Sequence, residues 1–196
     1  MIVYVSVSDV CSMNANTIHT VGQLWGFEKN KTPVCTVLVA SSFSGFAQKF
    51  WVQNFGVKRP KGVCLFFWPF KRGRLLAISV ATLLLLLRRR GEVKAIYSRN
   101  QRFLDLYGFF LLRFKFCFEL HKYDPNLNKK ITRIFDKTRD LSVVTISNSL
   151  KKKIQENDYR LPVYTLHDSC IPFHELARFD EPRPQIDENL SRFEFS

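Results

Sequence analysis

Short runs of apolar and β-branched residues alternate along the chain with longer segments in which apolar residues recur at helical spacing. Apolar runs of about four to eight residues between turn residues are typical of buried strands, and recurrence at i, i+3, i+4 and i+7 is typical of one helix face. The expected strands cover 2–7, 33–40, 62–67, 93–98, 115–120, 141–147 and 162–167, and the expected helices cover 16–29, 46–55, 75–87, 101–112, 126–139 and 147–156.

Nearly continuous apolar strands that are separated by helices indicate a parallel sheet covered on both faces. We therefore predict an α/β fold, with a Rossmann-like, doubly wound, mostly parallel sheet of about seven strands and helices on both of its faces. This domain should occupy residues 1–172. Residues 173–196 contain two prolines and 6 acidic against 3 basic residues, so we expect a charged linker or tail there.

The first expected helix has two faces of different character. Its apolar face is expected to be buried and consists of Ile18, Val21, Gly22 and Trp25. Asn16, His19 and Gln23 share another face by their i, i+3 and i+7 spacing. This polar face is either a solvated surface or a rim that faces a ligand, and either Asn14 or Asn16 can cap the helix.

The leucine-rich segment 75–87 lies between basic residues and has 13 residues. A helix that crosses the hydrocarbon layer of about 30 Å needs about 20 residues, so this segment should not span a membrane. We expect a buried helix, with an interfacial segment as the alternative. The short N-terminal apolar run is soon interrupted by Ser8 and Asp9, which argues against a secretory signal.

The net charge of +13 is concentrated in the first 100 residues, which carry 14 Lys and Arg against 3 Asp and Glu. A surface with this positive charge favours the binding of polyanions, for example phospholipid headgroups, lipid-linked phosphates or nucleic acid. The basic residues are scattered over many elements and form no known nucleic-acid-binding motif, so we expect no nucleic-acid partner.

Five cysteines stand in the chain without any CxxC spacing. Four of them lie in or beside apolar runs, which is typical of reduced core residues in a cytosolic protein. Neither the cysteines nor the four histidines cluster at ligand spacing in the sequence, so no metal site is predicted.

In open α/β sheets, ligands bind outside the carboxyl ends of the strands, so the residues that follow each strand are the candidates for a site. The first such turn contains no glycine, which argues against a nicotinamide or flavin dinucleotide because its pyrophosphate needs close backbone approach. No serine stands in a G-x-S-x-G turn, so a hydrolase triad is not supported either.

The fifth expected strand ends in Glu119, Leu120 and His121. Since side chains alternate along a strand, Glu119 and His121 should point to one face and Leu120 to the other. His121 is either a structural histidine or a group that hydrogen-bonds a substrate and steadies a developing charge. His167 and Asp168 repeat the pattern after the last expected strand, and Ser147 or Ser149 should cap the helix that follows the sixth.

Together these segments resemble the N-terminal, acceptor-side domain of retaining glycosyltransferases of the GT-B fold, family 4. The resemblance spans most of residues 1–172 and depends on the order of "NANTIH" after the first strand, "AIYSRN", "FELH", "VVTISNSLKKKI" and "VYTLHDS". It implies transfer of a sugar, with retention, from a nucleotide-sugar donor to a glycan or lipid-linked acceptor. It also implies that no cofactor and no metal ion are needed.

The resemblance assigns roles to residues as well. His121 would be catalytic and would face the transferred sugar or the leaving phosphate. Asn16 and His19 would line the floor of the cleft, and Arg99 and Glu119 would shape the acceptor side. The remaining substrate-binding candidates are Ser147, His167 and Asp168.

The chain also departs from the family. The donor-binding half with its paired glutamates has no counterpart here, and Ser169 stands where the family prefers glycine. We therefore expect half of an enzyme, inactive without a C-terminal domain or partner chain that binds the donor. The alternative is a non-catalytic remnant, or a partner- or membrane-binding module that kept the fold. A cytoplasmic location, peripheral on the anionic inner face of a membrane, would suit the basic first half.

Overall fold

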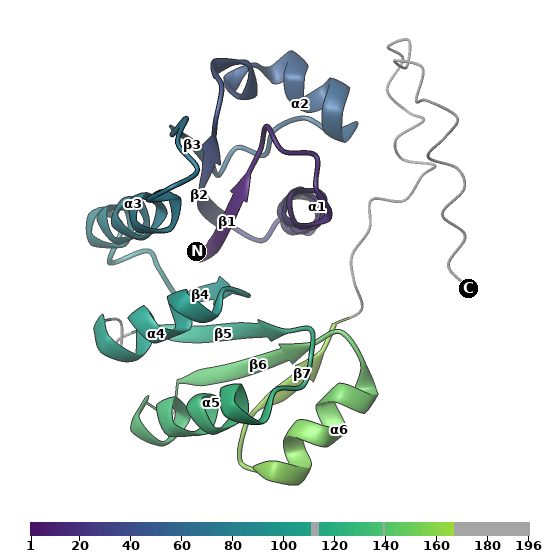
Figure 1. Ribbon diagram of the computed structural model, residues 1–196, viewed down its shortest axis with the longest axis vertical. Coiled ribbons are helices and arrows are strands. Elements are labelled where there is room, and N and C mark those ends of the chain that lie inside the picture. Colours follow the sequence, from purple (N-terminus) through teal and green to yellow (C-terminus); the bar gives the residue numbers. More distant parts are fainter. Residues whose placement is uncertain (111–113, 139, 167–196) are drawn as a thin grey trace.

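The computed structural model describes residues 1–110, 114–138 and 140–166. They form an α/β fold in which one all-parallel sheet of seven strands is flanked by helices, as the sequence pattern predicts (Figure 1). The strands are β1 (Ile2–Asp9), β2 (Val34–Ala40), β3 (Val63–Phe67), β4 (Ala95–Ser98), β5 (Lys115–Leu120), β6 (Leu141–Thr145) and β7 (Val163–Thr165). The helices are α1 (Ala15–Lys29), α2 (Gln48–Phe55), α3 (Arg74–Arg88), α4 (Gln101–Phe110), α5 (Pro125–Thr138) and α6 (Asn148–Asn157), with a short 3₁₀ helix, η1 (Phe43–Phe46), before α2.

The strand order β3-β2-β1-β4-β5-β6-β7 is that of a doubly wound, Rossmann-like sheet. β1 pairs with β2 on one side and with β4 on the other, so that Val3 lies opposite both Cys35 and Ile96. The chain therefore winds outward in two directions from β1 and β4. Ligands of such sheets bind where the winding reverses, at the carboxyl ends of these two strands.

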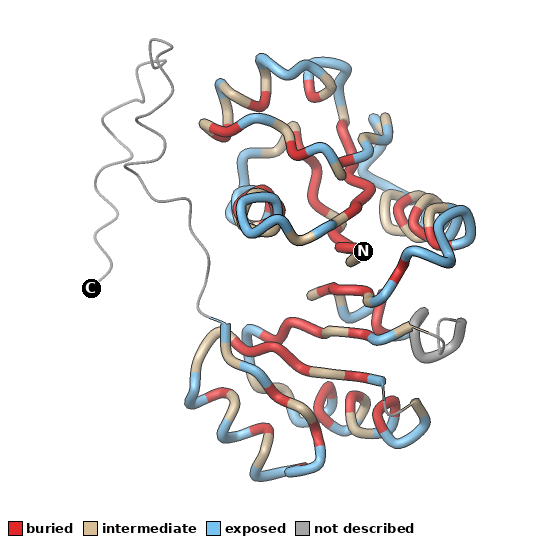
Figure 2. The backbone as a smooth tube through the Cα atoms, turned by 180° about the vertical axis from the view of Figure 1, so that it is seen from behind, coloured by how far each residue is buried: buried red, intermediate tan, exposed pale blue. Residues whose placement is uncertain are grey.

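The core lies on both faces of the sheet because neighbouring strand residues point to opposite sides. Val3 and Val5 of β1 pack in one cluster with Ile78 of α3 and Leu104 of α4. Tyr4 of β1 belongs to a second cluster that contains Leu24 of α1 and Trp51 of α2. Figure 1 shows α1 and α3 on opposite sides of the sheet, and Figure 2 shows buried positions gathered along its strands.

The buried face of α1 differs from the prediction. Val21 and Gly22 are buried as predicted, but Ile18 is 52% exposed and Trp25 is half-buried, and the other buried residues are Thr17, Thr20 and Leu24. The reason lies in hydrogen bonds to β1. The hydroxyl of Thr17 donates to the Asp9 carbonyl (3.1 Å), and the Thr20 hydroxyl lies 3.0 Å from that of Ser6 and 3.2 Å from that of Ser8. These polar contacts rotate the helix so that threonines, which an apolar pattern does not count, face the sheet.

The prediction of a buried helix at 75–87 is wrong for one side of α3. Ile78, Thr82 and Leu86 are buried and face the sheet. The opposite side is apolar and exposed, and it consists of Leu76, Val80, Leu83, Leu84 and Leu87. Only one side of α3 meets the sheet, so these residues contact solvent. Within the described part of the chain, no helix is both long enough and apolar enough to cross a membrane.

The cysteines follow the prediction only in part. Cys35 is buried, Cys11 and Cys117 are half-buried, and Cys64 is exposed. Cys64 lies on β3, which is the edge strand of the sheet and is therefore less covered. All four are free thiols, and Cys170 lies outside the described residues.

Gly62 allows the close approach of β2 and the start of β3. A Cβ atom at this position would lie 1.9 Å from the carbonyl oxygen of Val34, so the backbone would have to shift. We expect Gly62→Ala to lower the free energy of unfolding by about 1 to 3 kcal/mol, the usual cost of overpacking. Urea unfolding followed by circular dichroism measures the change.

Gly26→Ala is the matched control for this substitution. Gly26 lies in α1, and a Cβ atom there would meet nothing within 4 Å. Alanine should therefore raise the free energy of unfolding by about 0.5 to 1 kcal/mol, since glycine is the poorer helix former. Equal changes in the two variants would show that β2 and the start of β3 are not packed as described.

Candidate functional site

The polar turn between β1 and α1 leads into two asparagines that make different contacts. Asn14 is the N-cap of α1, and its side-chain oxygen accepts a hydrogen bond from the backbone N–H of Thr17 (2.9 Å). Asn16 lies two residues further along and makes a different contact, since its side-chain oxygen accepts from the Arg99 guanidinium. The second asparagine thus links α1 to the residue that follows β4.

Glu119, near the end of β5, is the centre of the site. Its side chain is only 2% exposed, and it accepts hydrogen bonds from four side chains. One carboxylate oxygen, Oε1, accepts from Nε2 of His19 (3.1 Å) and from Nε2 of His121. The other, Oε2, accepts from the hydroxyl of Tyr97 (2.6 Å) and from Nε2 of Gln23 (2.9 Å).

These donors come from parts of the chain that are far apart in sequence. His19 and Gln23 stand on α1, 100 and 96 residues from Glu119, and Tyr97 stands on β4, which pairs with β5. Gln23 and His19 reach the same carboxylate because their i, i+4 spacing places them on one side of the helix. Two members of the polar face of α1, His19 and Gln23, are therefore turned toward Glu119, whereas the third, Asn16, is exposed and contacts Arg99.

The hydrogen bonds decide the ionisation of this group. Burial alone raises the pKa of Glu119, but the hydrogen bonds from His121, His19, Tyr97 and Gln23 outweigh it and hold the pKa well below the usual range. Burial, together with the nearby negative charge, raises the pKa of Tyr97 well above its usual value. Burial and then Glu119 raise the pKa of the Cys117 thiol to about 12. The carboxylate is thus ionised near neutral pH, whereas Tyr97 and Cys117 keep their protons.

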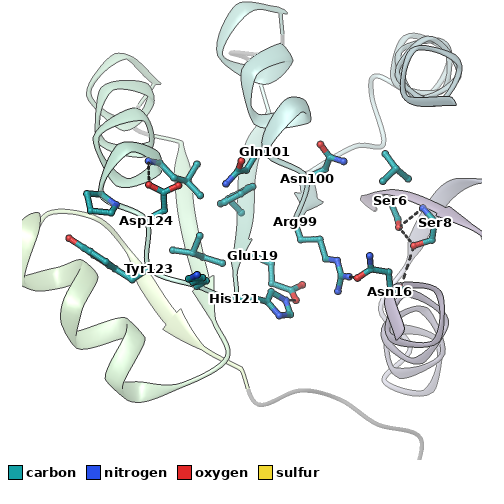
Figure 3. Close-up of a pocket in the computed structure, with 16 residues that line it drawn as sticks. Ser6, Ser8, Asn16, Arg99, Asn100, Gln101, Glu119, His121, Tyr123 and Asp124 are labelled. Atoms are coloured by element: carbon teal, nitrogen blue, oxygen red, sulfur yellow. Dashed lines mark hydrogen bonds and ion pairs between the residues drawn. The ribbon is translucent and has the colours of Figure 1, made fainter. Parts of the chain in front are cut away.

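A cavity of about 720 Å³ opens beside this cluster, at the carboxyl ends of β1, β4 and β5 (Figure 3). Its position is the one at which the winding of the sheet reverses. Figure 3 shows Arg99 reaching Asn16 on one side and Glu119 beside His121 on the other. The polar residues that line it are Ser6, Ser8, Asn16, Arg99, Asn100, Gln101, Glu119, His121, Lys122, Tyr123 and Asp124.

The predicted site residues fall into four groups. Asn16, Arg99, Glu119 and His121 line the cavity. His19 lies directly behind it, with its ring centroid 5.5 Å from that of His121 in an edge-to-face arrangement. Ser147 is not among the described residues that line the cavity; its hydroxyl accepts from the backbone N–H of Leu150 (3.3 Å) and caps α6, as expected. His167 and Asp168 lie outside the described residues.

Some polar residues of the site escaped the sequence analysis. Tyr97 anchors Glu119, yet in the sequence it looks like one more aromatic residue of a buried strand. The only signal that could have found it is the pairing of β4 with β5, which places Tyr97 opposite Cys117 and next to Glu119. Asp9, at the end of β1, is not among the described residues that line the cavity: its carboxylate accepts from the N–H groups of Cys11 and Ser41 and from the Arg74 guanidinium (3.0 Å), so it ties the start of α3 to β1.

His19, Glu119 and His121 each present a ligand atom, and these atoms lie within 4.8 Å of one another. Sequence spacing found no such cluster, because the two histidines meet only when α1 packs beside β5. Their exposure differs: the side chain of His19 is 14% exposed and that of His121 is 37% exposed. His121 is therefore the member that can meet a ligand in the cavity.

No protein-family model, curated protein or solved structure matches this chain.

Proposed function

We propose that this chain is the acceptor-side half of a retaining glycosyltransferase, which moves a sugar from a nucleotide-sugar donor to a glycan or lipid-linked acceptor. One observation carries the proposal: His121, Arg99 and Asn16 face one cavity at the carboxyl ends of the central strands. The resemblance to the acceptor-side domain of family 4 supports it through the same residues. The nucleotide-sugar would be bound by a C-terminal domain or by a partner chain.

The residues of the cavity suit the handling of a sugar. The guanidinium of Arg99 and the amide of Asn16 offer hydrogen bonds to acceptor hydroxyls, and their mutual contact fixes both side chains in advance. His121 is oriented by the ionised carboxylate of Glu119, which would also stabilise a positive charge on the imidazole. Such transfer depends on positioning and on stabilising charge at the sugar and the leaving phosphate, so we propose that it needs neither a cofactor nor a metal ion.

Binding of acceptors to the chain alone tests this proposal. A panel of oligosaccharides and short-chain lipid-linked sugars can be screened by saturation-transfer NMR. We expect a subset to bind and to lose binding in Arg99→Ala, whereas Lys152→Ala, on the exposed side of α6, should bind as the unchanged chain does. If no member of the panel binds, or if Arg99→Ala binds equally well, the proposed acceptor cavity is wrong.

A second candidate function is docking on an anionic lipid surface, and the exposed side of α3 favours it. The apolar stripe Leu76, Val80, Leu83, Leu84 and Leu87 is exposed along the helix. Exposed cations stand at both of its ends, with Lys71 and Arg72 before the helix and Arg88, Arg89 and Arg90 at its close. An apolar face flanked by cations is typical of helices that lie in the headgroup layer. The peripheral membrane location would follow from this surface.

Replacing Leu84 and Leu87 together by glutamine is expected to weaken binding to phosphatidylglycerol vesicles by about 10-fold or more, because two exposed leucines lose their apolar contact with the lipid. Vesicle flotation measures the bound fraction. Tyr159→Gln is the control, since Tyr159 is 84% exposed but lies in the turn after α6. Binding to neutral vesicles that is equally strong, or binding that survives the double substitution, would contradict a role for α3; a protein partner or a second copy would then cover the stripe.

A further inference from the structure

The cluster of His19, Glu119 and His121 has the donor set of a transition-metal site. Two imidazole nitrogens and one carboxylate oxygen form the His₂Glu combination that binds zinc with an open fourth position. The three ligand atoms lie within 4.8 Å of one another. In a tetrahedral zinc site with bonds of about 2.0–2.2 Å the ligand atoms are about 3.3 Å apart, so small rotations of these side chains suffice. We propose that this chain binds a divalent transition-metal ion, with Zn²⁺ as the best fit, through His19, Glu119 and His121.

The two carboxylate oxygens of Glu119 already have different hydrogen-bond partners, as such a metal site requires. Oε1 is the oxygen that faces both Nε2 atoms. Oε2 is held on the other side by Tyr97 (2.6 Å) and Gln23 (2.9 Å). With both imidazoles in the neutral tautomer that carries its proton on Nδ1, an ion could take the place of the two Nε2–H groups and meet Oε1 and both Nε2 nitrogens, while Tyr97 and Gln23 keep the carboxylate in place. Metal ligands are commonly fixed by such outer hydrogen bonds.

The surroundings also suit an ion that keeps an open position. The side chain of Glu119 is only 2% exposed, so its carboxylate would meet an ion in a site that water reaches poorly. His121 is the more exposed ligand and lines the cavity. The fourth coordination position of the ion would therefore open toward the cavity. Imidazole nitrogen and carboxylate oxygen favour zinc and its neighbours over magnesium or calcium, which prefer oxygen ligands alone.

The inference goes beyond the proposed glycosyltransferase function and does not depend on it. Metal binding is measured on the chain alone, without donor, acceptor or sugar transfer. An ion at this position would occupy the side of the cavity where His121 would meet a sugar. The metal-free chain would then be the form that supports sugar transfer, and zinc would compete with the sugar for this side of the cavity.

The test is titration of the full chain with ZnCl₂ by isothermal calorimetry, and with Co²⁺ by visible absorption. The expected result is one bound ion per chain and a Co²⁺ spectrum of tetrahedral intensity. His19→Ala and His121→Ala should each weaken binding by more than about 100-fold. Lys152→Ala, on the exposed side of α6, and Cys64→Ser, which removes an exposed thiol, should bind the ion as tightly as the unchanged chain.

Tyr97→Phe separates metal binding from folding, because phenylalanine keeps the ring but removes the hydrogen bond to Glu119. As a positioning residue, Tyr97 should affect zinc affinity by about 10- to 100-fold and alter the Co²⁺ spectrum, while circular dichroism remains native. The proposal is overturned if Zn²⁺ does not bind, if it binds equally to His121→Ala, or if only Cys64→Ser abolishes binding.

Discussion

Replacing Glu119 by alanine is expected to lower the free energy of unfolding by about 3 to 5 kcal/mol, the usual cost of removing one partner from a buried, paired cluster. The carboxylate is almost wholly buried and accepts from Tyr97, Gln23 and the two histidines. Without it, the hydroxyl of Tyr97 and the amide of Gln23 lose their acceptor in a place that water does not readily reach. Urea unfolding at pH 7, followed by circular dichroism, measures the loss.

Two variants control this experiment. Glu119→Gln keeps the size of the side chain and one acceptor oxygen, so it should lose less than the alanine variant. Glu28→Ala removes an exposed glutamate at the end of α1 and should change the free energy of unfolding by about 0.5 kcal/mol or less. If Glu119→Ala lowers the free energy of unfolding no more than Glu28→Ala does, Glu119 does not hold the cluster together.

The same carboxylate gives a pH dependence with a definite sign. Its pKa in the folded protein lies below the value of about 4.3 in an unfolded chain. Its contribution is therefore present above that pH and is lost as the pH falls toward the folded pKa. The difference in stability between the unchanged chain and Glu119→Gln should shrink as the pH is lowered from about 5 to about 3.

His121→Ala is expected to reduce the turnover rate of sugar transfer by about 10²- to 10³-fold when the chain is combined with a donor-binding half, as is typical for removal of one group that stabilises transition-state charge. The donor half of a retaining family 4 enzyme can be supplied as a fusion or a second chain. The donor Michaelis constant should change little, because the nucleotide would be bound by the other half. Product formation is followed by mass spectrometry, and the anomeric configuration by NMR.

Lys122→Ala is the matched control for His121→Ala, since it removes the neighbouring side chain from the wall of the same cavity. It should keep most of the transfer rate. Equal transfer rates of His121→Ala and Lys122→Ala would show that His121 has no role in the reaction. Inversion of the anomeric centre would contradict the proposed class of glycosyltransferase.

The sequence predicted the layers of the fold well, because strands that are buried on both faces appear as continuous apolar runs. β5 (Lys115–Leu120) begins and ends as expected. The orientation of individual helices was harder. In α1, Thr17 and Thr20 face the sheet through hydrogen bonds to β1, which a count of apolar residues cannot anticipate. In α3, leucines occur on every side of the helix, so the sequence pattern does not indicate which side packs against the sheet.

The site was predictable to the extent that it follows local periodicity. Strand alternation places Glu119 and His121 together, and it places Leu120 in the core on the opposite face. Helical spacing places His19 and Gln23 on one side of α1. That these two pairs meet depends on the packing of α1 beside β4 and β5, and a single sequence carries no direct signal for this contact.

One carboxylate, that of Glu119, holds both histidines at the edge of the cavity, and the proposed acceptor and metal sites both depend on it. The most direct measurement is the ¹⁵N spectrum of the histidine rings in the unchanged chain and in Glu119→Gln, with signals assigned through His19→Ala and His121→Ala. We expect the ring nitrogens of both His19 and His121 to shift, and Glu156→Gln on α6 to move neither. If only one of the two histidines responds to Glu119→Gln, or neither does, the cluster described here does not exist.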